Sequence, residues 1–211
     1  MEEFYVGYQS QAPVQLGGFL RRVAVALLVF VLLVAGGLVF AQAEFAKSYF
    51  GFGVLESFEG TIDGAWLITS DHTVLALVGE GKRGVAARPP SRVKITGQRI
   101  ERDGIVMIEV VSITPLDGAP VPPPDTDLGP LSLTGEIVDT KCYLGVMNPG
   151  AGKLHKDCAR NCLRGGIPAG IVAGDKLYFL EGRDFTGHAG LRVTLKGRAV
   201  QRAGQLILRA E

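Results

Sequence analysis

Apolar positions form one long uninterrupted run near the start of the chain, whereas every later apolar segment is short. Residues 23–41 contain no charged or strongly polar side chain. At about 1.5 Å per residue, a helix of this length spans roughly the 30 Å hydrocarbon core of a bilayer. The pattern therefore predicts one transmembrane helix over residues 23–41.

The charges that flank this run predict its orientation. Arg21 and Arg22 directly precede it, whereas the nearest cation on its other side is Lys47. Because positively charged flanks stay in the cytoplasm, we expect residues 1–22 to form a cytoplasmic leader and the rest of the chain to be exported. In a bacterium this places the anchor in the inner membrane and the bulk of the chain in the periplasm, which is an oxidising compartment.

A signal-peptidase site is the alternative to a permanent anchor. Ala41-Gln42-Ala43 has the A-x-A pattern at which such an enzyme cuts. The apolar run is, however, longer than the about 7–15 residues of a signal-peptide core. We therefore favour an uncleaved anchor, and the C-terminal part is exported in either case.

The pattern beyond the anchor is that of β-structure. Glycine and proline are abundant, and the short apolar segments are bounded by turn signals such as Asp103-Gly104 and Ala203-Gly204. This pattern predicts an all-β soluble part with tight hairpins. The net charge is only +1, with both signs interspersed, and no series of aromatic residues is available for base stacking. These two features argue against nucleic acid as a partner.

An internal repeat divides the soluble part into two copies. Residues 92–110 align with residues 192–210 at an offset of one hundred, without a gap and with their apolar positions in register. Similar strands, residues 58–62 and 133–137, precede the two aligned stretches. Five pairs are identical: Arg92/Arg192, Val93/Val193, Gly97/Gly197, Arg102/Arg202 and Gly104/Gly204. The chain therefore contains the same small β-domain twice.

We expect these copies to be two tandem small OB-like β-barrels, at residues 54–116 and 131–211, because strands of this number and length fit that architecture. Residues 117–130 lie between them and hold five of the eleven prolines. Proline lacks the amide hydrogen that a sheet needs and favours an extended conformation. This stretch is therefore expected to be a semi-rigid linker that stays outside the sheets.

The second copy carries an insert, residues 141–166, that contains every cysteine of the chain. A short helix is expected at residues 153–163, ended by Gly165-Gly166. It places one histidine and two cysteines on one helical face. The third cysteine ends the preceding strand. The candidate metal ligands are therefore Cys142, His155, Cys158 and Cys162.

The second domain resembles a recurring family of exported, membrane-anchored bacterial proteins that is largely uncharacterised. The residues that carry the resemblance are Val-Asp-x-x-Cys at 138–142, His-x-x-Cys-Ala-x-x-Cys at 155–162 and Gly-x-Pro at 166–168. The resemblance covers about residues 130–211. It implies an anchored or secreted accessory role and no particular reaction.

Several interpretations of the cysteine cluster remain open. A disulfide from Cys142 to Cys158 or Cys162 suits an exported domain but leaves one thiol over. A Cys3His zinc site has a standard ligand set. A soft-metal or redox site would take copper, with Met147 as a thioether ligand. Covalent haem is disfavoured because the spacing is not C-x-x-C-H.

The remaining candidates carry little chemistry. His72 and His188 stand alone in predicted loops, and the glycine-rich stretch 79–84 lacks the phosphate-binding loop pattern. No Ser-His-Asp pattern or persuasive carboxylate pair is present, so we expect no enzymatic activity. We therefore expect a single-pass periplasmic accessory subunit of a larger membrane complex for redox or electron transfer, with lipid and other membrane subunits as partners. The alternative is a zinc- or copper-binding or thiol-redox protein.

Overall fold

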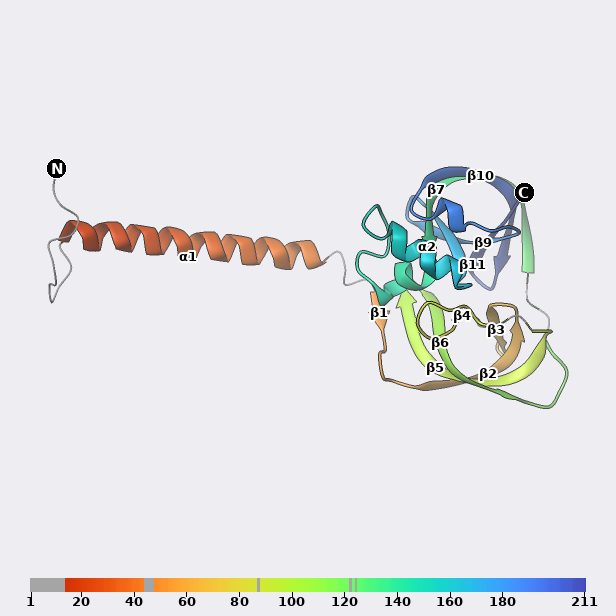
Figure 1. Ribbon diagram of the computed structural model, residues 1–211. Coiled ribbons are helices and arrows are strands. Elements are labelled where there is room, and N and C mark those ends of the chain that lie inside the picture. The colour runs from red at the N-terminus through yellow and green to blue at the C-terminus, as the bar shows by residue number, and fades with distance from the viewer. Residues whose placement is uncertain (1–13, 44–47, 87, 122, 124) are drawn as a thin grey trace. The chain divides into compact units, whose positions relative to one another are not determined.

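The computed structural model describes residues 14–43, 48–86, 88–121, 123 and 125–211 (Figure 1). It divides into two compact units at residue 46, a helical one and a β-rich one, and each is described by itself. The helical unit contains α1, Val14–Ala43. The remaining elements belong to the β unit.

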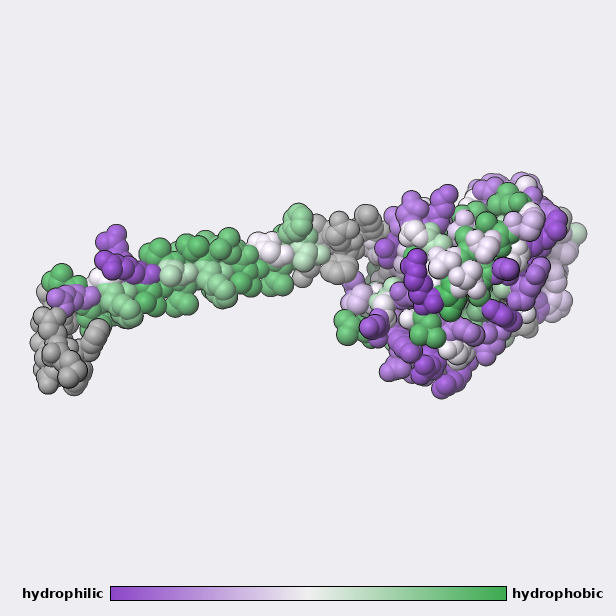
Figure 2. Space-filling view, turned by 90° about the horizontal axis from the view of Figure 1, so that it is seen from above, coloured by the Kyte–Doolittle hydropathy of each residue, from purple (hydrophilic) through white to green (hydrophobic). Residues whose placement is uncertain are grey.

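Helix α1 is apolar around its circumference. Its large side chains are exposed, and Figure 2 shows hydrophobic colour along the helix apart from a polar cluster near its N-terminal end. The helix formed by residues 14–41 is long and apolar enough to cross a membrane. The helix begins before the predicted start at residue 23 and includes Arg21 and Arg22. Residues 1–13 of the predicted leader lie outside the described residues.

The first barrel is a closed five-stranded sheet in which β4 and β6 are parallel and the other neighbours antiparallel. A short extra strand, β1, pairs with β5 and lies upstream of the predicted domain start at residue 54. The strands are β1 Ser48–Phe50, β2 Glu56–Asp63, β3 Trp66–Thr69, β4 Val74–Val78, β5 Ser91–Arg102 and β6 Ile105–Pro115.

The second barrel repeats this connectivity. Its five strands close in the order β10-β11-β9-β8-β7, which matches β5-β6-β4-β3-β2 of the first barrel, and its one parallel pair, β11 with β9, corresponds to β6 with β4. The internal repeat therefore corresponds to two closed five-stranded barrels. The strands are β7 Asp125–Asp139, β8 Ala169–Ala173, β9 Lys176–Glu181, β10 Arg192–Arg202 and β11 Gln205–Ala210, with a short 3-10 turn, η3, at Thr186–His188.

The identical glycines of the repeat have the same structural task in both copies. A Cβ atom at Gly97 would collide with the backbone oxygen of Glu109, and one at Gly197 with that of Arg209. The turns that follow also agree, because residues 103 and 104 have φ values of 51° and 78°, and residues 203 and 204 have 44° and 88°. Two positive φ values at the central residues suit a tight two-residue hairpin.

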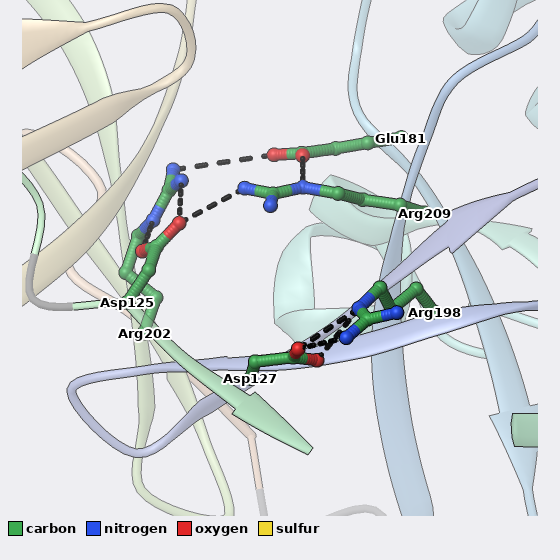
Figure 3. Close-up of polar contacts among 6 residues, drawn as sticks. All are labelled: Asp125, Asp127, Glu181, Arg198, Arg202 and Arg209. Carbon is green, nitrogen blue, oxygen red and sulfur yellow. Dashed lines mark hydrogen bonds and ion pairs between the residues drawn. The ribbon is translucent and has the colours of Figure 1, made fainter. Parts of the chain in front are cut away.

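The predicted linker is shorter than expected, because β7 begins at Asp125 and residues 125–130 pair with β10. Figure 3 shows ion pairs that hold this part of β7: Asp125 accepts hydrogen bonds from Arg202 at 2.6 and 2.8 Å, and Asp127 accepts one from Arg198 Nε at 2.9 Å. At Pro130, strand β7 has β10 as its neighbour and is not paired with β8. No second strand therefore needs the amide hydrogen that proline lacks.

The two barrels share a core and are therefore not independent domains on a string. One buried cluster joins side chains of both barrels and of the insert. At its centre the Trp66 ring of β3 lies 4.7 Å from the Phe179 ring of β9, edge to face. Trp66 is 5% exposed, as expected for a core residue. The insert is thus packed between the barrels.

A buried lysine from the insert enters the first barrel. The Lys141 ammonium donates hydrogen bonds to the carbonyl oxygens of Gly79 and Gly81, at 3.0 and 2.6 Å, and to Glu109 Oε1 at 2.7 Å. Lys141 is 2% exposed and Glu109 6%. Each charge is therefore satisfied by the other barrel, which ties the two together.

Replacing Lys141 by methionine should lower the free energy of unfolding by about 3–5 kcal/mol, because Glu109 is left buried without its cation. The double variant Lys141→Met, Glu109→Gln should lose much less than the sum of the two single variants. Urea unfolding of the full chain in detergent, followed by the fluorescence of its single tryptophan, measures this.

The matched control is the exposed pair Lys94 and Glu59, whose charged atoms are 3.9 Å apart. Lys94→Met should change the free energy of unfolding by less than about 1 kcal/mol. Equal losses for the two lysine variants would contradict a buried tie between the barrels.

Candidate functional site

The insert consists of two short helical segments joined by a loop. Segment η2, Cys142–Val146, is a π-type turn separated from the end of β7 by Thr140 and Lys141, and α2, Lys156–Arg164, follows the loop. Helix α2 starts three residues later than predicted because residues 153–155 form a turn. Gly165 caps it through its amide, which donates to carbonyl oxygens of the last turn, as predicted.

Three cysteine sulfurs meet where η2 and α2 approach one another. The Sγ atoms of Cys142, Cys158 and Cys162 all lie within 4.8 Å of each other. Cys142 and Cys162 are buried, whereas Cys158 is partly exposed. Met147 adds a fourth sulfur, because its Sδ atom is 3.7 Å from Cys158 Sγ. The cluster therefore offers four soft donor atoms and is open on the side of Cys158 and Met147.

The disulfide from Cys142 to Cys158 or Cys162 is not formed, and all three cysteines are free thiols. Cys142 and Cys162 instead interact as two thiols, each of which shifts the pKa of the other. A disulfide would require two sulfurs about 2 Å apart and would leave the third without a partner. The three sulfurs converge on one point, and no two of them form a bonded pair that excludes the third.

His155 reaches this cluster through an acidic residue that was not among the predicted ligands. Its Nε2 lies 2.8 Å from Asp139 Oδ2, and Asp139 Oδ1 accepts the backbone amide of Cys142 at 2.9 Å. Asp139 is completely buried and His155 is 3% exposed. The ligand atoms of Asp139, Cys142 and His155 form a second group within 4.8 Å, which shares Cys142 with the three sulfurs.

This arrangement separates the four predicted ligands into two linked groups. His155 is grouped with Asp139 and Cys142 and not with Cys158 or Cys162. If the Asp139 carboxylate accepts a hydrogen from Nε2, Nδ1 is the ring nitrogen that keeps a lone pair. Carboxylate–histidine pairs of this kind commonly orient the ligands of a metal. Asp139 belongs to the Val-Asp-x-x-Cys motif, and this motif was the feature of the sequence that could have identified Asp139 as part of the site.

The thiols differ in acidity. The hydrogen bond between Cys142 and Cys162, with burial and the nearby Asp139 carboxylate, raises the pKa of Cys142. The same hydrogen bond lowers the pKa of Cys162. Burial raises the pKa of Cys158, and the Lys82 charge opposes that effect. The thiolate is the form of these cysteines that binds metal.

The first barrel contributes the glycine-rich stretch 79–84, for which the sequence predicts only a loop. The Gly84 amide donates to the Gly165 carbonyl oxygen at 2.9 Å, at the end of α2. A Cβ atom at Gly165 would collide with the carbonyl oxygen of Lys82. The glycines thus permit backbone-to-backbone contact and bring Lys82 toward the thiols. The high density of glycines in residues 79–84 was the feature of the sequence that could have indicated this contact.

A cavity of about 420 Å³ also lies between the barrels, lined by Trp66, Phe179, Glu181 and Arg202 among others. Its Arg202 guanidinium is already paired with Asp125, and Glu181 accepts a hydrogen bond from Arg209 at 3.1 Å (Figure 3). These polar groups are therefore largely satisfied within the protein. The cavity carries less chemistry than the sulfur cluster.

Neither of the other two histidines belongs to a group of candidate ligands. His72 and His188 are exposed, as expected for loop residues. Comparison with known proteins adds no assignment, since no family model, curated protein or solved structure matches this chain.

Replacing Asp139 by alanine should lower the free energy of unfolding by about 2–6 kcal/mol. The change leaves two buried donors, the Cys142 amide and the His155 ring, without an acceptor, and each costs about 1–3 kcal/mol. The control is Asp157→Ala on α2, whose side chain is 90% exposed. It should lose less than about 1 kcal/mol. Urea unfolding that ranks the two variants equally would rule out the bridging role of Asp139.

Proposed function

We propose that this chain is a membrane-anchored metal-handling protein that binds Cu(I) through Cys142, Cys158 and Cys162, with Met147 as a further ligand. The observation that carries the proposal is the convergence of three free thiols within 4.8 Å, with the Met147 thioether 3.7 Å from Cys158. Thiolate and thioether are soft donors and select a soft ion.

The position of His155 favours copper over zinc. A Cys3His zinc site needs the imidazole and all three thiolates around one ion. Here the imidazole is grouped with Asp139 and Cys142 only. Sulfur atoms alone are left around the point where the thiols converge. In this proposal His155 and Asp139 act as supports that hold η2 and α2 in place.

Exposure suggests how the ion enters and leaves. Cys142 and Cys162 are 4% and 2% exposed, whereas Met147 is 46% exposed and Cys158 is partly exposed. A flexible thioether beside a partly exposed thiol can take up an ion before the buried thiols bind it. The site is therefore suited to accepting and passing on an ion.

The anchor determines where this would happen. We propose that α1 crosses the bacterial inner membrane with its N-terminus in the cytoplasm and the β unit in the periplasm, which the Arg21-Arg22 pair supports. We also propose that both barrels are of the OB type. Their shared strand order, with one parallel pair each, supports this.

Anaerobic titration of the full chain in detergent against a chromogenic Cu(I) chelator tests the proposal. We expect one Cu(I) per chain. Cys142→Ser, Cys158→Ser and Cys162→Ser should each lower the affinity by about 100-fold or more, which exceeds the roughly 10–100-fold effect of losing an outer-shell partner. Met147→Leu should have a smaller effect, because the three thiolates remain.

The control for this titration is His72→Ala, an exposed histidine between β3 and β4 that should leave the affinity unchanged. Cu(I) binding that survives all three serine variants would contradict the proposal. Retention of one zinc ion, lost on His155→Ala, would favour the Cys3His site instead.

A role as an accessory subunit of a larger membrane complex stays a prediction. Helix α1 favours it, because its apolar side chains are exposed all round and Gly36-Gly37 lets another helix approach closely. A tagged full chain purified in mild detergent should then retain a stoichiometric membrane-protein companion. Recovery of a lone chain, with copper affinity intact, would count against the accessory role alone.

A further inference from the structure

The β unit begins with a patch of exposed apolar side chains. Tyr49, Phe52, Val54 and Leu55 are 54%, 80%, 55% and 57% exposed. They fall within seven consecutive residues that start in β1 and continue through the turn after it. We call these four side chains the entry patch. Such a concentration of exposed apolar groups marks an interaction site more often than single ones do.

The backbone holds the entry patch outward. The Phe52 amide donates to the Phe50 carbonyl at 2.9 Å, and the Val54 amide donates to the Gly51 carbonyl at 3.0 Å. Gly53 has a φ of 78°, and its amide donates to Gln98 Oε1 at 2.7 Å. The turn is therefore built by hydrogen bonds, which keep its side chains exposed although the neighbouring core is apolar.

Phe50 connects the entry patch to the interior. Its ring packs against the core cluster that includes Cys142, and the Phe52 ring meets it edge to face with a centroid distance of 5.8 Å. Phe52 therefore extends an internal aromatic contact to the surface. An occupant of the patch would continue the packing that begins in the core.

The connection to the anchor identifies the occupant. From Ala43, the last residue of α1, to Ser48, the first residue of β1, there are five residue steps, which span at most about 18 Å. Any membrane that holds α1 is therefore within reach of the entry patch. Aromatic and aliphatic side chains of this kind settle at the boundary between headgroups and acyl chains.

We propose that the entry patch docks the β unit onto the lipid surface of the membrane in which α1 is anchored. The inference rests on the proposed anchoring and is independent of copper. Segment β1 also lies against η2, where a Cβ atom at Gly145 would be 3.1 Å from Ser48 Cβ. Docking therefore holds the cysteine-bearing insert close to the membrane, and a membrane protein is the kind of partner that could exchange an ion with it.

Tryptophan scanning in vesicles tests the docking. The full chain with Phe52→Trp or Val54→Trp is reconstituted into phosphatidylcholine and phosphatidylglycerol vesicles, with or without bromine-labelled acyl chains. The only native tryptophan is buried, so the wild-type chain supplies the background. Both variants should show blue-shifted emission that brominated lipid quenches at least twofold beyond this background.

The matched control is Leu128→Trp, at a position that is 50% exposed in β7. The first residues of β7 and strand β1 lie at opposite ends of the β unit in Figure 1. Quenching of this control should equal the wild-type background. Quenching of Phe52→Trp and Val54→Trp no greater than that of Leu128→Trp would overturn the docking.

Alkaline extraction of the same vesicles keeps the two proposals apart. An anchored chain stays with the lipid at high pH, and one that is extracted refutes the anchoring. A chain that resists extraction while its patch tryptophans remain unquenched refutes the docking alone.

Discussion

The buried ammonium of Lys141 is the contact on which the arrangement of the β unit depends. It crosses from the insert of the second barrel to two carbonyl oxygens and one carboxylate of the first. A charge that is so fully shielded from water is stable only with partners of this geometry. The next residue along the chain is Cys142. The tie between the barrels therefore also sets the position of the first thiol.

Two copies of one barrel serve different purposes in this chain. The copies share strand order, hairpin turn and the glycines at which strands come close. Only the second carries the insert, and the first supplies the surface on which that insert closes, through Lys82 and the glycines around it. The first barrel thus forms one wall of the candidate site, and the three cysteines all belong to the second.

The sequence indicated the cysteines of the candidate site but not how they are arranged. Cysteines at this spacing, with Met147 nearby, were recognisable because soft donors are rare in the chain. Asp139 was harder to recognise, since a carboxylate at the end of a strand gives no sign of whether it will be exposed or buried. The absence of a disulfide also depended on how the three sulfurs face one another.

The sequence by itself determined the apolar helix, the β class and the twofold repeat, because these follow from local periodicity, turn residues and a match at a fixed offset. It also indicated which residue types the site contains. Only the tertiary structure decided that residues 125–130 join a sheet, that the barrels share a core and that Lys141 is buried against Glu109. These outcomes depend on contacts between residues far apart in the chain, and no local pattern encodes which distant partner a charge or strand will meet.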